Sequence, residues 1–369
     1  MKQFKKFIWN IVTILSCIGL IALLVSAFSD RVSPLNYPYI PFFGLFFPFI
    51  LAYNAAFFVL WILFRKWTQV VLSLVVFVAC IGPVRHYFPI HSRTKEVPEN
   101  CIKVLTYNVM RFNHLKKHTR NNPNPIIQYV INQNPDIVCF QEHGTVLKDK
   151  KHLTEKDLIE ALKMPYHEMI RIEHSPSDHF YGISVFSKFP ILSVEKFPIE
   201  SSYNGAALFE LDINGKKVSL INVHLESNKI TSDERSGYYK FTMEPNTQKL
   251  EAFTHMMFQR LTPAYKIRAK QAELINAEIK KSKNPYTIVC GDFNDTPISY
   301  ARYKINENLS DAFSDTGSGM GITFNQHRFL FRIDYIFHSK NIKAYNCTVG
   351  KLRDSDHYPV WTYLELSDN

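Results

Sequence analysis

The chain has 369 residues, of which 46% are hydrophobic and 21% are charged, which excludes a disordered chain and suffices for one large domain with additional segments. The formal net charge is +10, a value that can indicate a nucleic-acid partner. Residues 1–96 hold nine basic and two acidic residues, so the rest of the chain, with 34 basic and 31 acidic residues, is nearly neutral. The excess charge therefore lies beside apolar segments and is better explained by membrane topology.

Three apolar segments occupy the N-terminal part of the chain, at 7–28, 40–64 and 67–84. The first contains no charged residue and exceeds the roughly 20 residues that a helix needs to span a bilayer. Only Arg65 and Lys66 separate the last two, which indicates a tight helical hairpin. We therefore predict a membrane anchor of three transmembrane helices in residues 1–96. A cleavable signal peptide is the alternative for the first segment.

Basic residues predict the orientation of this anchor. Lys2, Lys5 and Lys6 precede the first segment, and the positive-inside rule places them in the cytoplasm together with the Arg65–Lys66 pair. Three crossings then place the chain after Val84 on the outer side. The sequence thus predicts an integral membrane protein whose C-terminal domain lies on the extracytoplasmic side, in contact with the lipid bilayer and with no protein partner indicated.

The character of the sequence changes near residue 97. Short β-branched runs, among them KVLTYNVM, DIVCFQE, KVSLINVHLES and YTIVCGDFN, alternate with helical stretches. Such alternation is typical of an α/β or mixed-sheet enzyme domain, which we place at residues 97–369.

Polar residues interrupt or end these runs where a buried strand should avoid them. They are Asn108, Glu142, His224, Asp292, Asn294, Asp334, Asp356 and His357. Taken singly, each could be a turn former, a helix cap or a core histidine. Taken together, buried carboxylates without partners would cost several kcal/mol each, on the order of the usual desolvation penalty, so they require a cation.

Acid and amide oxygens at converging strand ends suit Mg²⁺ or Mn²⁺. Such an ion, with histidines nearby, suits attack of water on a phosphorus centre. The sequence contains no HExxH motif and no cysteine cluster that would favour zinc.

The ordered motifs TYNV, DIVCFQE, GISVFSKFPI, NVHLES, GDFND, IDYIF and SDHYPV resemble those of the endonuclease/exonuclease/phosphatase superfamily, also called DNase I-like. The resemblance covers roughly residues 100–366. It implies a four-layered α/β sandwich, in which two mixed β-sheets pack face to face between helices and the site lies at one end.

The resemblance also implies roles for the polar residues. Asn108 and Glu142 match the metal-binding pair, and Asp356 matches a second carboxylate on the metal side. The number of metal ions stays open.

The remaining five residues match the catalytic group. Asp292 would orient or deprotonate the attacking water, Asn294 would hold water or phosphate, and His224 would contact the scissile phosphate. His357 would be oriented by Asp334 and act as base or as electrostatic stabiliser.

An insertion of about 40 residues separates HLES from RAKQAEL. In it, Leu250, Phe253, Met257 and Leu261 recur at helical spacing and predict an amphipathic helix. That helix packs on its own domain or, alternatively, forms a lid or a membrane-facing element beside the site. In RAKQAEL itself, Arg268 and Gln271 either match a helix of the family or face solvent.

Three functions are compatible with these patterns. The first is a membrane-anchored, Mg²⁺- or Mn²⁺-dependent phosphodiesterase of the nuclease type. The second is a sphingomyelinase- or phospholipase C-like enzyme, or another phosphatase, which acts on a lipid or small phosphoester. The third, an inactive binding module on an anchor, is disfavoured because every expected polar position is filled.

Overall fold

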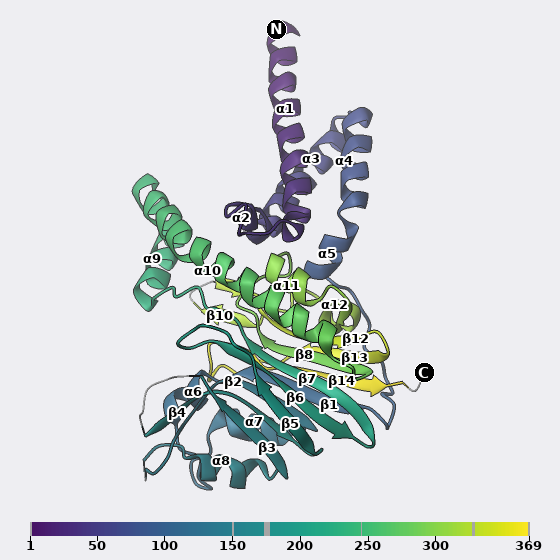
Figure 1. The fold of residues 1–369 in the computed structure, drawn as a ribbon. Coiled ribbons are helices and arrows are strands. Elements are labelled where there is room, and N and C mark those ends of the chain that lie inside the picture. The colour runs from purple at the N-terminus through teal and green to yellow at the C-terminus, as the bar shows by residue number, and fades with distance from the viewer. Residues whose placement is uncertain (1, 150, 173–177, 245, 327–328, 368–369) are drawn as a thin grey trace.

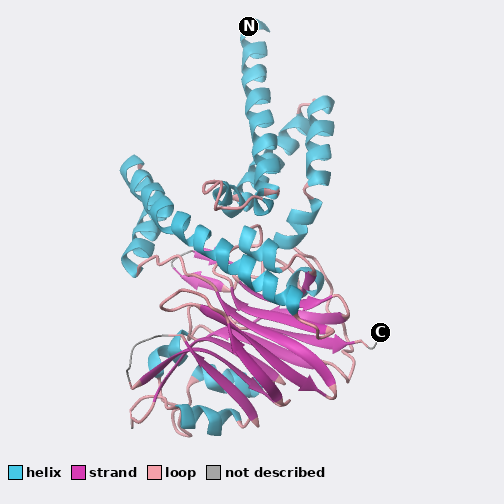
Figure 2. Ribbon diagram, in the orientation of Figure 1, coloured by secondary structure: helices cyan, strands magenta, loops and turns pink. Residues whose placement is uncertain are grey.

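The structure, a computed structural model, describes residues 2–149, 151–172, 178–244, 246–326 and 329–367. Its larger part contains two six-stranded mixed sheets that pack face to face, with helices on both outer sides (Figures 1 and 2). The predicted sandwich of two mixed sheets flanked by helices is therefore confirmed.

The first sheet has the strand order β13-β14-β1-β2-β4-β3, and β1 and β2 are its parallel pair. The strands are β1 (Ile102–Asn108), β2 (Ile137–Val146), β3 (Tyr166–Arg171), β4 (His179–Ser187), β13 (Ile342–Val349) and β14 (Val360–Leu366).

The second sheet has the order β5-β6-β7-β8-β12-β9, and β7 and β8 are its parallel pair. The strands are β5 (Ile191–Lys196), β6 (Gly205–Ile213), β7 (Lys216–His224), β8 (Tyr286–Asp292), β9 (Leu309–Asp311) and β12 (Asp334–Ser339). A separate hairpin is formed by β10 (Phe324–Gln326) and β11 (Phe329–Phe331).

The main core lies between the two sheets, where Val104 and Cys139 of the first sheet pack in one cluster with Phe209 and Ile288 of the second. Each fully buried large aliphatic side chain there contributes about 1.5–3 kcal/mol. Two further cores lie under the outer helices, which are α7 (Pro125–Gln133) and α8 (Glu155–Leu162) on the first sheet, and α10 (Thr247–Lys281) and α11 (Tyr300–Ile305) on the second. Four layers result.

The N-terminal part contains α1 (Lys2–Ala27), η1 (Ser29–Arg31), α2 (Ile40–Leu45), α3 (Phe47–Leu63), α4 (Trp67–Ala79) and α5 (Ile81–Tyr87). Among the described residues, one helix, Gln3–Ala27, is long and apolar enough to cross a membrane. A second candidate exists if α4 and α5, which are bent by 62°, count as one span. The prediction of three spanning helices is therefore wrong.

Prolines account for the difference. Pro41 and Pro48 each lie in the first turn of a helix, so the predicted segment 40–64 divides into α2 and α3 around Phe46. Similarly, Pro83 lies in the first turn of α5, and the predicted segment 67–84 bends before it.

The N-terminal helices pack against the sandwich. A Cβ atom added to Gly44 in α2 would lie 2.2 Å from the carbonyl oxygen of Ile298, so the two backbones touch there. Ile298 shares an apolar cluster with Leu23 and Phe47. The Arg332 guanidinium donates a hydrogen bond to the carbonyl oxygen of His86. The apolar N-terminal segment and the sandwich therefore form a continuous packed surface.

A buried ion cluster stabilises the same region. Asp311 accepts from Arg302 and from Arg332, each at 3.1 Å, and all three side chains are at most 2% exposed. Burial alone would raise the pKa of Asp311, but the two guanidinium groups lower it well below its usual range. Removal of the carboxylate would leave two buried cations without this partner.

We expect Asp311→Ala to lower the free energy of unfolding by roughly 3–5 kcal/mol, the usual cost of breaking a buried ion pair. Thermal or urea unfolding of the full chain measures this change. The control is Asp212→Ala, which removes an exposed ion pair with Lys217 and is expected to leave the melting temperature nearly unchanged. Equal effects of the two substitutions would contradict the assignment.

Candidate active site

Strand register brings three of the predicted catalytic residues together at the ends of adjacent strands in the second sheet. His224 lies opposite Asp292 in the β7–β8 pair, and Asp334 lies opposite Asp292 in the β12–β8 pair. Gly291 precedes Asp292 with a φ of +138°, and a Cβ there would lie 1.9 Å from the carbonyl oxygen of Val223. Glycine is therefore required where the backbone turns Asp292 toward the site.

A β-bulge positions Glu142 on the first sheet. The register between β2 and β4 shifts between Phe140 and His143, and Glu142 adopts a φ of +48°. Its neighbour Gln141 points inward and donates to the Asn222 side chain of the other sheet at 2.7 Å. Because a bulge redirects one side chain of a strand, Glu142 faces the pocket while Gln141 joins the sheets.

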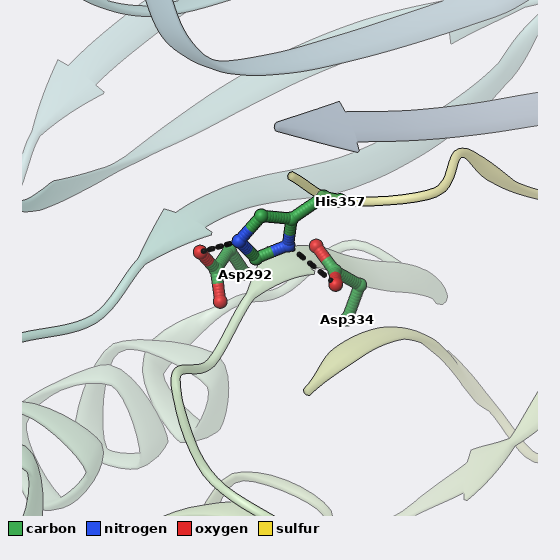
Figure 3. A group of neighbouring side chains, drawn as sticks. All are labelled: Asp292, Asp334 and His357. Carbon is green, nitrogen blue, oxygen red and sulfur yellow. Dashed lines mark hydrogen bonds and ion pairs between the residues drawn. The ribbon is translucent and has the colours of Figure 1, made fainter. Parts of the chain in front are cut away.

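His357 lies between two carboxylates (Figure 3). Its Nδ1 atom lies 2.9 Å from an oxygen of Asp334, and its Nε2 atom lies 3.6 Å from an oxygen of Asp292. Burial would lower the pKa of His357, but the charges of Asp334 and Asp292 raise it well above its usual value. The two carboxylates therefore favour the cationic form of the imidazole.

Asp292 is the centre of the arrangement. It accepts hydrogen bonds from the Asn108 side chain at 3.0 Å and from the Asn294 backbone at 2.8 Å, and His224 Nε2 lies 3.6 Å away. Its pKa is raised to about 6, chiefly by burial, against the opposing charge of His357. Burial lowers the pKa of His224, which favours its neutral form.

Glu142 and Asp356 form the acidic side of the same pocket. The Glu142 side chain is 29% exposed, and its pKa is raised by burial and next by the charge of Asp356. A divalent cation between these carboxylates would relieve their repulsion, and hard oxygen ligands are those that Mg²⁺ prefers. The residues therefore fit a divalent metal ion.

A second group could also hold an ion, because ligand atoms of Asp292, Asp334 and His357 lie within 4.8 Å of one another. In this group, however, both ring nitrogens of His357 already face carboxylate oxygens (Figure 3). We therefore describe these three residues as a charge-paired dyad with Asp292 beside it.

The structure brings together all eight residues predicted from the sequence. Six of them line one pocket, namely Glu142, His224, Asp292, Asn294, Asp356 and His357. Asp334 bonds to His357, and Asn108 donates from Nδ2 to both Glu142, at 3.2 Å, and Asp292. The Asn108 oxygen accepts from the Met110 backbone, so its role as a metal ligand stays a prediction.

Arg268 and Gln271 are buried, which excludes the solvent-facing interpretation. Arg268 donates to Asp295 at 3.0 Å, and Gln271 accepts from the Glu226 backbone at 2.9 Å. They hold the chain segments that follow β7 and β8 beside the pocket. The two residues belong to a single 35-residue helix, α10, that also contains the predicted amphipathic segment.

Thr323 and Phe324, at the start of the β10–β11 hairpin, support the Asp334–His357 dyad. The sequence did not indicate this role. Thr323 accepts from the Asp334 backbone at 3.1 Å, and the ring of Phe324 lies 5.1 Å from that of His357. Strands of three residues are too short to show a period of two, and the bridge between Phe324 and His357 is long-range.

The fold and this site define a class of protein. The chain belongs to the endonuclease/exonuclease/phosphatase family, whose model matches residues 105–357. A second model, Domain of unknown function (DUF8431), matches residues 6–87.

Solved structures with the same fold include the human nocturnin catalytic domain with bound sulfate anion, at a TM-score of 0.52 and 17% identity, covering 74% of this chain and 98% of that one. The family member from Bacteroides vulgatus gives a TM-score of 0.49 and 19% identity, over 73% and 100%. TDP2 from Caenorhabditis elegans gives 0.48 and 17%, over 73% and 76%. No curated protein matches the sequence.

Proposed function

We propose that the protein is a divalent-metal-dependent phosphoester hydrolase that uses Mg²⁺ or Mn²⁺. The observation that carries the proposal is the convergence of Glu142, Asp356, Asp292 and the Asp334–His357 dyad on one pocket. Glu142 and Asp356, with Asn108 beside them, would hold the ion. When bound, the ion would neutralise charge on the phosphoryl oxygens and so make phosphorus more open to attack.

The side chains divide the remaining work. Asp292, held by Asn108 and Asn294, orients the attacking water and accepts its proton. The cationic His357, fixed by Asp334, stabilises the charge that builds up on the phosphoryl oxygens. Neutral His224, whose Nε2 atom lies 3.6 Å from an oxygen of Asp292, contacts the phosphate.

Loss of one metal-side carboxylate tests the proposal. We expect Glu142→Gln to raise the Mg²⁺ concentration for half-maximal hydrolysis of bis(p-nitrophenyl) phosphate by roughly 10–100-fold, a range typical of perturbed metal sites. The control is Glu200→Gln, an exposed glutamate outside the pocket. Hydrolysis that survives EDTA, or an unchanged Mg²⁺ requirement, would count against metal dependence. Absence of hydrolysis with every metal and ester would favour the inactive binding module.

We further propose that residues 97–369 are the catalytic domain and that residues 1–96 tether it to a membrane. A single crossing by α1, with Lys2, Lys5 and Lys6 inside, would place this domain on the outer side. Apolar side chains of α1 support the tether. Only 22% of the apolar 18-residue stretch of this helix is buried, and Phe7, Ile14 and Ile21 are more than half exposed. Isolated helices with such surfaces are stable in lipid rather than in water.

The tether and its orientation are tested together. We expect the full chain to stay with the membrane fraction after carbonate extraction, and a C-terminal alkaline phosphatase fusion to be active. A C-terminal fusion that is active only as a cytoplasmic reporter would reverse the orientation. Release of the full chain by carbonate would remove the tether.

The sequence motifs predict a nuclease-type phosphodiesterase first and a hydrolase of lipid or small phosphoesters as the alternative. The side chains that line the pocket bear on the choice between these substrates.

A further inference from the structure

The catalytic pocket is lined by apolar as well as polar side chains. Its volume is about 290 Å³, and its polar lining residues include Glu142, Asp292 and His357. The remaining wall includes a set of apolar side chains that we call the apolar annex, namely Leu45, Met257, Leu261, Tyr265, Phe331 and Ile333. The space beside the reacting centre is therefore amphipathic.

The apolar annex is built partly from the N-terminal segment. Leu45 and Phe42 of α2 share one buried cluster with Met257, Leu261 and Tyr265 of α10. The ring centroids of Phe42 and Tyr265 lie 5.6 Å apart in an edge-on contact. Figure 1 shows α2 between the foot of α1 and helix α10. The wall of the pocket thus reaches the apolar helices that would lie in a membrane.

The cations at the pocket do not form a track for a polyanion. Among the described residues that line it, the Lys and Arg side chains are Lys229, Arg235 and Arg268. Arg268 is paired with Asp295 and Lys229 with Glu226, at 3.0 and 2.7 Å. Binding of a nucleic-acid chain draws on several phosphate contacts along a basic groove. Binding of a single phosphate group requires fewer cationic side chains.

We propose that the substrate is an amphiphilic phosphoester drawn from the bilayer, whose phosphate lies at Asp292 and His357 and whose hydrocarbon chain occupies the apolar annex. This inference rests on the proposed hydrolase function and specifies its substrate class. In the reaction, a water oxygen bonds to phosphorus, the ester P–O bond breaks, and the leaving oxygen takes a proton. The annex contributes through burial of methylene groups, each worth roughly a fourfold gain in kcat/KM.

A chain-length series tests the proposal. The full chain in lipid nanodiscs is assayed with Mg²⁺ on methyl, butyl and octyl p-nitrophenyl phosphate, where only the alkyl chain differs. We expect kcat/KM for the octyl ester to exceed that for the methyl ester by about 100-fold, which corresponds to three or four buried methylenes. Calorimetric titration with octyl and methyl phosphate in EDTA gives a second readout that needs no turnover.

Variants separate the annex from partitioning into the nanodisc. Met257→Trp fills the annex and is expected to lower the octyl-to-methyl ratio at least tenfold. Leu250→Trp alters the same helix at a position 49% exposed and outside the pocket, and it should leave the ratio unchanged. Because the ratio is measured within each variant, a reduced folded fraction cancels.

The outcomes distinguish this inference from the proposed function. A ratio near one, an equal ratio in all three proteins, or faster hydrolysis of a single-stranded oligonucleotide than of the octyl ester would overturn the lipid assignment and leave the hydrolase intact. Failure to hydrolyse any of these esters would overturn both.

Discussion

Asp292→Asn is expected to lower kcat by roughly 10³–10⁴-fold, the upper part of the range for loss of a general base. The amide keeps the shape of the carboxylate, but it has one acceptor oxygen, so it can keep only one of the hydrogen bonds that Asn108 and Asn294 donate to the two oxygens of Asp292. It cannot take a proton from water. Steady-state hydrolysis of bis(p-nitrophenyl) phosphate at saturating Mg²⁺ measures the loss.

The pH dependence of hydrolysis should follow the protonation state of Asp292. The pKa of Asp292 is raised to about 6, so its base form grows as the pH rises through that value, and activity should rise with it. Metal binding nearby moves this limb to lower pH, because a cation favours the carboxylate. The control Asp212→Asn lies on the surface and should keep the wild-type profile. Retention of a tenth of the activity in Asp292→Asn would rule out its role as base.

Asp334→Asn should lower kcat by roughly 10²–10⁴-fold, because the histidine loses the carboxylate that fixes and charges it. In the native protein the paired carboxylates keep the pKa of His357 high against the effect of burial. Without the charge of Asp334, that pKa falls, and the ring becomes neutral at lower pH.

The two roles open to His357 predict opposite shifts. A cationic stabiliser loses function when it is deprotonated, so the alkaline limb of kcat/KM should move to lower pH in Asp334→Asn. A histidine that acts as base requires the neutral form, so its variant would gain relative activity near neutral pH. Profiles from pH 5 to 10, with circular dichroism to verify folding, decide between them. Coincident limbs in the two proteins would dissociate Asp334 from the titration of His357.

The polar residues at the strand ends could be identified from the sequence because buried strands usually avoid polar side chains. Asn108, Glu142, Asp292 and Asp334 each follow or interrupt an apolar run. A strand alternates sides with a strict period of two, so a polar residue at its end is informative about place as well as composition. The register then brought these residues together, as in the pairs of Asp292 with His224 and Asp334.

Local backbone geometry could not be predicted in the same way. Residues 110–115 all have positive φ values, between 44° and 65°, which form a left-handed turn directly after β1. Such a turn costs about 1–2 kcal/mol per residue and has no composition signal, since Met110, Phe112 and Leu115 are ordinary right-handed formers. Tertiary packing must supply the compensation, and Phe112 is fully buried.

For the apolar N-terminal segments, the sequence predicted more spanning helices than the structure contains. Their composition satisfied a hydropathy criterion three times, yet hydropathy does not register where a helix breaks. Pro48 and Pro83 set those breaks. Long-range contacts were equally hidden, because nothing local to Leu45 indicates that it lies in the wall of a pocket whose other lining residues run from Glu142 to His357.

The direct packing of α2 and α5 on the sandwich limits how far the pocket can move relative to the N-terminal helices. Gly44 touches the backbone at Ile298, and Arg332 bonds to His86, so the described chain provides no free-swinging arm between the two parts. With the proposed tether, the opening of the pocket would stay at one height above the bilayer. The enzyme would sample molecules that diffuse laterally past its base, and its turnover would depend on their surface density rather than on their concentration in the surrounding water.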